Sequence, residues 1–153
     1  MKWQCDGLTT YSPRMNEVYE CVRRFADTDY PVLISGETGT GKEMLARMVH
    51  RLSSQRAGPF LVESPGAIAD SLLESELFGA NRGAFSGAER DRGGLLQAAD
   101  GGALYLDGIE EASEEFQVKL LRFLQDGTFR AVGASHSAQV RLRLICSTSK
   151  SGE

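Results

Sequence analysis

The sequence predicts an α/β fold in which a central, mostly parallel sheet is flanked by helices. Three observations support this prediction. The β-branched apolar run of residues 32–34 leads into a glycine-rich turn and then into a helical pattern at residues 43–50. A second apolar run, residues 103–106, ends in Asp107, as a buried parallel strand does at the sheet edge where ligands bind. Apolar residues between these runs recur at helical spacing, which is the alternation typical of α/β proteins.

The first half of the chain is predicted to contain a polar lead, two strands and three helices. Ser12 and Pro13 have the form of an N-cap and a first helical residue, and apolar residues then recur at helical spacing. After the helix at residues 43–50, a second short strand is predicted at residues 60–62. A capping box that begins at Ser71 predicts a helix up to about residue 78.

The second half is predicted to begin with a loop at residues 79–94 and a short helical turn. Ser113 has the form of an N-cap for a helix that ends at Gly127. Residues 128–132 are a candidate short strand, and residues 133–139 form a polar loop. A last strand is predicted at residues 140–146.

Composition indicates one globular domain. The chain has 153 residues, of which 41% are hydrophobic, and this is enough for a sizeable core. The net charge is −4 and no long basic run is present, so we expect no direct contact with nucleic acid. No apolar stretch approaches the roughly 20 residues of a membrane span, and the first residues do not form a signal peptide. We therefore expect a cytoplasmic protein without membrane contact.

Cysteines and histidines give no sign of a disulfide framework or a zinc site. Cys5, Cys21 and Cys146 are scattered and lack the C-x-x-C spacing, so they are expected to be reduced thiols without a functional role. His50 and His136 are isolated, and we expect both at the surface.

The glycine-rich turn is the strongest candidate for a binding site. The pattern G-x-x-x-x-G-K is complete between a predicted strand and a predicted helix, which is the order that a phosphate cradle needs. Glycines let backbone N–H groups turn toward phosphate oxygens, and the lysine adds a full cation. The Ser or Thr that usually follows the lysine is a glutamate in this chain. The predicted nucleotide-binding residues are Gly36, Glu37, Thr38, Gly39, Thr40, Gly41, Lys42 and Glu43.

Two further positions stand out near the predicted sheet. Asp107 ends a buried strand, so its carboxylate is predicted to hold magnesium directly or through water, although an ordinary strand-end aspartate is the alternative. Phe85 is a lone large aromatic residue in a loop of glycines and alanines. It either packs back on the body or contacts a partner protein, and we favour the partner contact.

Four segments together resemble one protein family. The chain resembles the central AAA+ ATPase domain of bacterial sigma-54-dependent transcription activators, the enhancer-binding proteins, over about residues 12–148. The segments that carry the resemblance are GETGTGKE at residues 36–43, LLESELFG at 72–79, GAFSGA at 83–88 and QVKLLR at 117–122.

The resemblance implies the α/β subdomain of a P-loop NTPase of the AAA+ type, with ATP and Mg²⁺ as ligands. Family members form ring-shaped homo-oligomers, usually hexamers, and push a GAFTGA loop against sigma-54 so that the polymerase opens the promoter. By this resemblance Phe85 is the main contact with sigma-54 RNA polymerase. Ser86 stands where the family has threonine, which keeps the hydroxyl and removes a methyl group.

The resemblance also predicts the domain organisation. Residues 1–153 are expected to be a single AAA+ sigma-54 interaction domain that ends before the family's arginine fingers and helical lid. Ring assembly is therefore expected of a full-length form. Contact with DNA is expected only through a domain outside this sequence, in a regulator of the two-component response-regulator kind.

Three further positions, all outside the GAFSGA loop, depart from the family pattern. The family's second motif places a glutamate that polarises the attacking water after the aspartate, whereas Gly108 follows Asp107 in this chain. The family's asparagine after the second strand aligns with Ser64, and its γ-phosphate sensor asparagine aligns with Ser149. No catalytic residue is therefore assigned. The pattern predicts that binding of a triphosphate is retained while its hydrolysis is impaired.

Two functions remain open from the sequence. The first is an ATP-driven remodeller of sigma-54 RNA polymerase. The second is a nucleotide-binding regulatory or assembly module with little or no hydrolysis. Glu110 or Glu111 replaces the missing glutamate only if the backbone after Gly108 bends back toward the phosphates. A small-molecule kinase is disfavoured because it leaves the GAFSGA loop unexplained.

Overall fold

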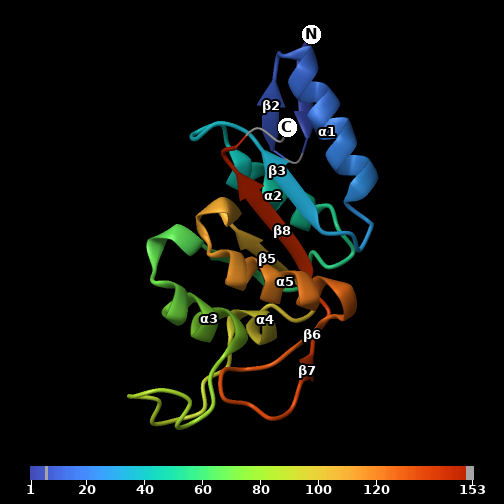
Figure 1. The fold of residues 1–153 in the computed structure, drawn as a ribbon. Helices are drawn as coiled ribbons and strands as arrows, with labels where there is room; N and C mark the ends of the chain where they lie inside the picture. The colour runs from blue at the N-terminus through green and yellow to red at the C-terminus, as the bar shows by residue number, and fades with distance from the viewer. Residues whose placement is uncertain (6, 151–153) are drawn as a thin grey trace.

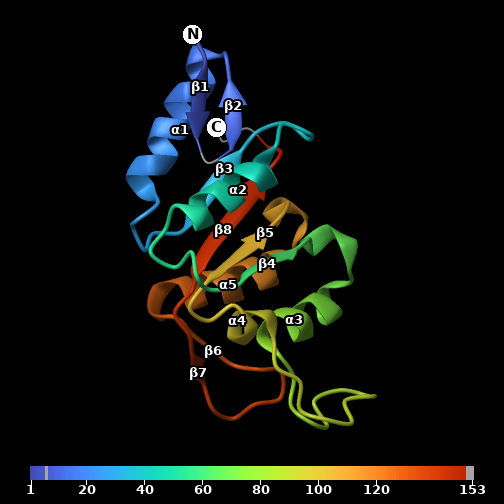
Figure 2. The same ribbon diagram turned by 180° about the vertical axis from the view of Figure 1, so that it is seen from behind.

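The computed structural model describes residues 1–5 and 7–150. A four-stranded sheet in the order β3-β8-β5-β4 lies at its centre, and each neighbouring pair of strands is parallel (Figures 1 and 2). The strands are β3 (Val32–Ser35), β4 (Phe60–Glu63), β5 (Ala103–Leu106) and β8 (Arg143–Thr148). The predicted α/β fold with a parallel central sheet is confirmed.

Helices cover both faces of this sheet, with α5 in front of it in Figure 1 and α2 in front of it in Figure 2. Strand β5 shows why helices are needed on both faces of the sheet. All four of its residues are buried, and successive side chains point to opposite faces. Ala103 and Tyr105 pack in the core of α1 and α2, whereas Leu104 and Leu106 pack in the core of the other helices. The helices are α1 (Pro13–Phe25), α2 (Lys42–Arg51), α3 (Asp70–Phe78), α4 (Leu95–Ala98) and α5 (Glu114–Asp126).

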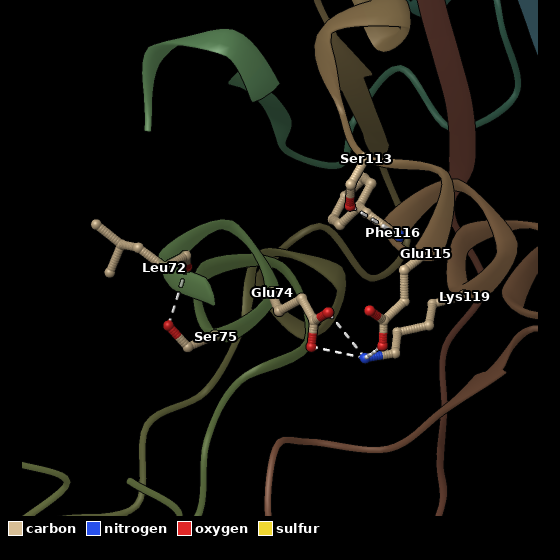
Figure 3. Close-up of polar contacts among 7 residues, drawn as sticks. All are labelled: Leu72, Glu74, Ser75, Ser113, Glu115, Phe116 and Lys119. Carbon is tan, nitrogen blue, oxygen red and sulfur yellow. Dashed lines mark hydrogen bonds and ion pairs between the residues drawn. The ribbon is translucent and has the colours of Figure 1, made fainter. Parts of the chain in front are cut away.

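Local capping explains where two of the helices begin. The Ser12 hydroxyl accepts a hydrogen bond from the Met15 N–H at 3.5 Å, and the Ser113 hydroxyl accepts one from the Phe116 N–H at 3.3 Å (Figure 3). Both N-caps were predicted, and they satisfy N–H groups that have no partner inside the helix. The predicted end of α5 at Gly127 is also confirmed, because this residue has a φ of 72°.

The predicted capping box at Ser71 is wrong. Helix α3 begins one residue earlier, at Asp70, and its N-cap Ala69 has no side chain that can accept a hydrogen bond. The negative charge of Asp70 lies in the first turn, where it favours the helix N-terminus electrostatically.

Strand bounds in the C-terminal part differ from the prediction. The predicted strand at 128–132 is only β6 (Thr128–Phe129), and the predicted loop at 133–139 ends in β7 (Ala138–Gln139), which pairs antiparallel with β6. The last strand begins at Arg143 rather than at residue 140 and continues to Thr148. Its register is set by pairing with β3 and β5, which no local pattern encodes.

Residues before Ser12 are not a simple polar lead. Strands β1 (Trp3–Cys5) and β2 (Leu8–Thr10) form an antiparallel pair beside α1 (Figure 1). Cys5 is buried in the core of α1 and α2, and all three cysteines are free thiols. No helix in the described part of the chain is long and apolar enough to cross a membrane.

His50 does not lie at the surface, which corrects the prediction, whereas His136 is exposed as expected. The His50 ring packs against the Phe60 ring with centroids 5.4 Å apart, on the side of α2 that faces the sheet. Arg143 is also buried. Its guanidinium donates to the carbonyls of Phe25 and Ala26, and thereby caps the end of α1.

Candidate functional site

The glycine-rich loop lies between β3 and α2, as predicted. Gly36 N–H donates to the Thr148 carbonyl at 3.1 Å and so continues the parallel pairing of β3 with β8 into the loop. Gly39 and Gly41 have φ values of 81° and 91°, which other residues rarely adopt. Gly41 is the N-cap of α2 and offers no side-chain acceptor, so the first N–H groups of this ten-residue helix stay available to an anion.

The Lys42 side chain folds back onto the glycine loop and contacts its backbone. Its ammonium group donates to the carbonyls of Gly36 at 2.7 Å and Glu37 at 2.8 Å, while the Thr40 hydroxyl donates to the same Glu37 carbonyl at 2.7 Å. Among the described residues Lys42 uses two of its three N–H donors in these contacts. The cation is therefore fixed at the loop with one donor left for a ligand.

A cleft of about 540 Å³ opens at this loop. This size suits a small-molecule ligand. Residues from four places in the fold line it: the glycine loop with the start of α2, and the segments after β4, β5 and β8. Five of the predicted nucleotide-binding residues face the cleft: Thr38, Gly39, Gly41, Lys42 and Glu43. The other three form the back of the loop: Gly36, Glu37 and Thr40. Glu43 also forms an ion pair with Arg47 at 2.7 Å.

Asp107 lies at the carboxyl end of β5 and faces the cleft. One of its oxygens, Oδ1, accepts hydrogen bonds from the Ser147 hydroxyl at 2.6 Å and from the Tyr105 hydroxyl at 3.0 Å. Burial raises the pKa of Tyr105 to about 12, so this phenol stays protonated and donates. Gly108 N–H in turn donates to the Ser147 hydroxyl at 3.1 Å. No sequence motif singled out Ser147 or Tyr105.

Magnesium fits the donors at this site. Oδ2 of Asp107 accepts no hydrogen bond from the described residues, which leaves one carboxylate oxygen for a cation. The described residues contain no group of three or more His, Cys, Asp or Glu that could hold a metal ion. Mg²⁺ commonly binds through one or two carboxylates together with phosphate oxygens and water. Asp107 fits that mode.

The backbone after Gly108 bends back toward the cleft. Gly108 has a φ of 78°, and the next residues form the short helix η2 (Ile109–Glu111). Both Glu110 and Glu111 line the cleft as a result. The Ser149 N–H and hydroxyl each donate to Oε1 of Glu110 at 2.7 Å. Ser64 also lines the cleft, so all three positions outside the GAFSGA loop that depart from the family pattern meet there.

The GAFSGA loop, residues 83–88, leaves the body of the molecule at the end opposite the β1–β2 hairpin (yellow-green in Figures 1 and 2). Gly83 and Gly87 have φ values of 80° and 99°, and Gly83 N–H donates to the Ala88 carbonyl at 2.8 Å. Phe85 is 50% exposed at this turn, and Ser86 is exposed beside it. Phe85 therefore does not pack into the core, which was one of the two alternatives.

Strand, glycine loop and helix at the end of a parallel sheet, with Asp107 at the end of a neighbouring strand, define a P-loop NTPase domain. A model of one family, described as the sigma-54 interaction domain, matches residues 8–153. The chain belongs to this family.

Known proteins show the same relationship. The chain is 51% identical over 142 residues to the hydrogenase transcriptional regulatory protein HoxA of Bradyrhizobium diazoefficiens, which covers 93% of this chain and 29% of HoxA. It is 46% identical over 145 residues to the Nif-specific regulatory protein of Rhodobacter capsulatus, covering 95% of this chain and 25% of that protein. The chain thus spans under a third of the curated relatives named here.

Solved structures agree with the fold. NtrX from Brucella abortus in complex with ATP is similar with a TM-score of 0.81 and 37% identity, over 94% of this chain and 32% of that one. The P-loop NTPase domain of a sigma-54 activator from E. coli is similar with a TM-score of 0.59 over 93% of this chain and 79% of that one. At 20% identity the second comparison supports the fold alone.

Proposed function

We propose that this chain is the ATP-binding domain of a sigma-54-dependent transcription regulator and contacts sigma-54 RNA polymerase through residues 83–88. The observation that carries the proposal is the coexistence of two separate features. One is a cleft that contains the glycine loop and Asp107. The other is an exposed aromatic residue on a loop that projects from the body.

ATP and Mg²⁺ are the ligands that the cleft suits. Backbone N–H groups at the start of α2 and the Lys42 ammonium favour the phosphates of a nucleotide. Asp107 has a free carboxylate oxygen for Mg²⁺, which would offset the phosphate charge. The related NtrX has been crystallised with ATP and with ADP.

Assembly and location follow from the family. We propose a ring-shaped homo-oligomer for the full-length protein and DNA binding through another domain, since the relatives are more than three times longer than the matched part. The charge of −4 supports the view that this domain itself does not bind DNA. A cytoplasmic location is proposed because that is where transcription takes place in bacteria.

Nucleotide binding is tested with Lys42→Ala. A fluorescent ATP analogue is titrated into the chain with Mg²⁺ present, and the affinity is read from anisotropy. Removal of the ammonium should weaken binding about 30-fold, because a charge-assisted hydrogen bond contributes roughly 2 kcal/mol. Lys2→Ala removes an exposed lysine and should bind like wild type. Failure of the wild type to bind the analogue would refute the ATP assignment.

Contact with sigma-54 is tested with Phe85→Ala. Purified sigma-54 is captured on the immobilised chain in the presence of a transition-state analogue of ATP hydrolysis, and the retained fraction is measured. Phe85→Ala should abolish capture, because it removes the one large aromatic side chain that the GAFSGA loop exposes. Phe25→Ala is the matched control, because Phe25 is 52% exposed on α1, and it should retain capture. Equal capture by both variants would refute the contact.

A further inference from the structure

Gly108 stands where the family's second motif has a glutamate, and in this chain it forms a tight turn. Its φ of 78° lies in the left-handed region, where a glutamate side chain would be strained. The turn folds η2 back over the end of β5, so that the site of an added Cβ on Gly108 lies only 3.5 Å from the Glu111 carboxyl carbon. The two residues that follow Ile109 therefore reach the cleft.

The Glu110 carboxylate is held by one residue from the segment after β8, the strand that pairs with β5. Ser149, just after β8, donates to Oε1 with both its N–H and its hydroxyl at 2.7 Å. Burial alone would raise the pKa of Glu110, but these hydrogen bonds outweigh it and lower the pKa to about 2. The carboxylate is therefore ionised at neutral pH, and the two hydrogen bonds that Oε1 accepts from Ser149 fix its orientation.

The second oxygen, Oε2, has no such donor. It is buried and accepts no hydrogen bond among the described residues. An unsatisfied buried acceptor destabilises the folded state, and an anionic one does so more strongly. Since Glu110 belongs to the wall of the cleft that contains Lys42 and Asp107, a donor that reaches Oε2 from this cleft would remove that destabilisation. This oxygen is out of contact with solvent in the present structure, so a water molecule beside a bound phosphate donates to it only after η2 or the Glu110 side chain turns toward the cleft.

Glu111 is placed differently. Its carboxylate packs against Gly66, where an added Cβ would lie 1.5 Å from Glu111 Oε2. Gly66 thus makes room for Glu111 on the segment after β4. Glu111 thus packs η2 against the segment after β4. Glu110 instead accepts hydrogen bonds from Ser149, just after β8.

Resting on the proposed binding of ATP, we propose that Glu110 is a catalytic residue that orients the attacking water for ATP hydrolysis, and that Ser149 and Gly108 position it. After the turn that brings Oε2 to the cleft, the water donates a hydrogen bond to it, and the water oxygen forms the new bond to the γ-phosphorus. The bond between the γ-phosphorus and the oxygen that bridges to the β-phosphate breaks, and its electron pair leaves with ADP. The net products are ADP, inorganic phosphate and the water proton, which passes to the solvent. Two of the departures from the family pattern, Gly108 and Ser149, then serve the same purpose, because both position Glu110.

The experiment measures ATP binding and ATP conversion separately on the whole chain. Affinity comes from displacement of a fluorescent analogue, and conversion of bound ATP to ADP is followed in a single turnover. Glu110→Gln should keep the affinity within about threefold and slow conversion by about 10² to 10⁴-fold, the usual effect of losing a water-positioning carboxylate. Glu114→Gln, at an exposed glutamate that begins helix α5 and does not line the cleft, should behave like wild type.

Ser149 and Gly108 provide the positioning tests. Ser149→Ala should slow conversion about tenfold without a change in affinity, and Ser149→Thr, which keeps the hydroxyl, should restore it. Gly108→Glu should not accelerate conversion, because a glutamate is strained in the left-handed backbone conformation of this position. A Gly108→Glu variant that converts ATP more than about tenfold faster than wild type would place the carboxylate at residue 108 and overturn the proposal.

One readout does not involve nucleotide. The pKa of Glu110 is about 2 in the folded chain against an ordinary value of 4.5, so the folded state releases this proton more readily than the unfolded state. This contribution to stability is complete above about pH 4.5 and is lost as the pH falls toward 2. Glu110→Gln should remove that part of the acid dependence, and Glu114→Gln should keep it.

The outcomes separate the two proposals. A wild type that does not bind ATP refutes the proposed function and this inference with it. A wild type that binds ATP but does not convert it overturns the role of Glu110 and leaves ATP binding intact. If Glu110→Gln converts ATP at the wild-type rate, the role of Glu110 is likewise overturned. The same holds if the stability of Glu110→Gln depends on acid pH as that of wild type does.

Discussion

The ammonium of Lys119 lies 2.8 Å from both carboxylate oxygens of Glu74 and joins helix α5 to helix α3 (Figure 3). Glu115, one turn before Lys119, adds a second carboxylate at 3.6 Å. Helix α5 starts three residues after the short helix that carries Glu110, and α3 ends just before the GAFSGA loop. The ion pair therefore connects the helix next to the cleft with the helix next to the proposed partner contact.

This ion pair should contribute modestly to stability. We expect a double-mutant cycle with Glu74→Gln and Lys119→Met to give a coupling free energy of about 0.5–1 kcal/mol, because both side chains are partly exposed. The hydrogen bonds that the Lys119 ammonium donates to the Glu74 carboxylate also raise the pKa of Lys119. Urea denaturation of the four proteins measures the coupling. Strictly additive effects of the two substitutions would show that the pair is not formed in solution.

Arg143 should contribute more than an exposed arginine does. Its guanidinium donates to the Phe25 carbonyl at 2.6 Å and to the Ala26 carbonyl at the end of α1. Arg143→Met leaves these acceptors unsatisfied, so the free energy of unfolding should fall by about 2–3 kcal/mol. Arg141→Met removes only an exposed ion pair with Asp29 and should cost at most about 1 kcal/mol. Equal losses in urea denaturation would contradict the capping role.

The buried histidine should make stability depend on pH. Burial lowers the pKa of His50 below its ordinary value of 6.5, although a hydrogen bond with the Gly58 backbone opposes this. The unfolded chain therefore binds this proton more readily, and the free energy of unfolding should fall as the pH drops below 6.5. His50→Leu should remove this dependence, whereas His136→Gln, at an exposed position, should retain it. A flat profile for wild type between pH 7 and about pH 5.5 would contradict the assignment.

Ser147 should control the metal dependence of nucleotide binding. Its hydroxyl bridges the Gly108 N–H and Asp107 Oδ1, so Ser147→Ala frees the carboxylate to rotate. The Mg²⁺ concentration needed for half-maximal binding of an ATP analogue should rise about tenfold, as when an outer partner of a metal ligand is lost. Ser75→Ala removes another buried hydroxyl, bonded to the Leu72 carbonyl in Figure 3, and should leave the Mg²⁺ dependence unchanged. The same shift in both variants would point to general destabilisation.

Local signals predicted most of the fold. The caps at Ser12 and Ser113 and the glycine at 127 act over a few residues, and the structure has all three where they were predicted. The capping box at Ser71 failed because the pattern alone does not say whether its first residue lies at the N-cap or inside the first turn. The start of the last strand was misplaced because pairing with β3 and β5, distant in sequence, sets it.

The candidate site was predicted only in part. Residues 36–43 and Asp107 were found because a strand, a glycine turn and a lysine at fixed spacing identify a phosphate cradle without knowledge of the rest of the chain. Their role in binding remains a prediction. Ser147 was missed because its contact with Asp107 joins residues 40 positions apart.

The sequence by itself predicted an α/β fold and a glycine loop between a strand and a helix, because apolar periodicity and the spacing of the glycines and the lysine are local signals. Only the tertiary structure decided where the acidic side chains after β5 lie. A left-handed turn at Gly108 brings Glu110 to Ser149, 39 positions later, and no local pattern specifies that contact. Burial of His50 and Arg143 has the same origin, because packing against β4 and the end of α1 outweighs the usual preference of polar side chains for water.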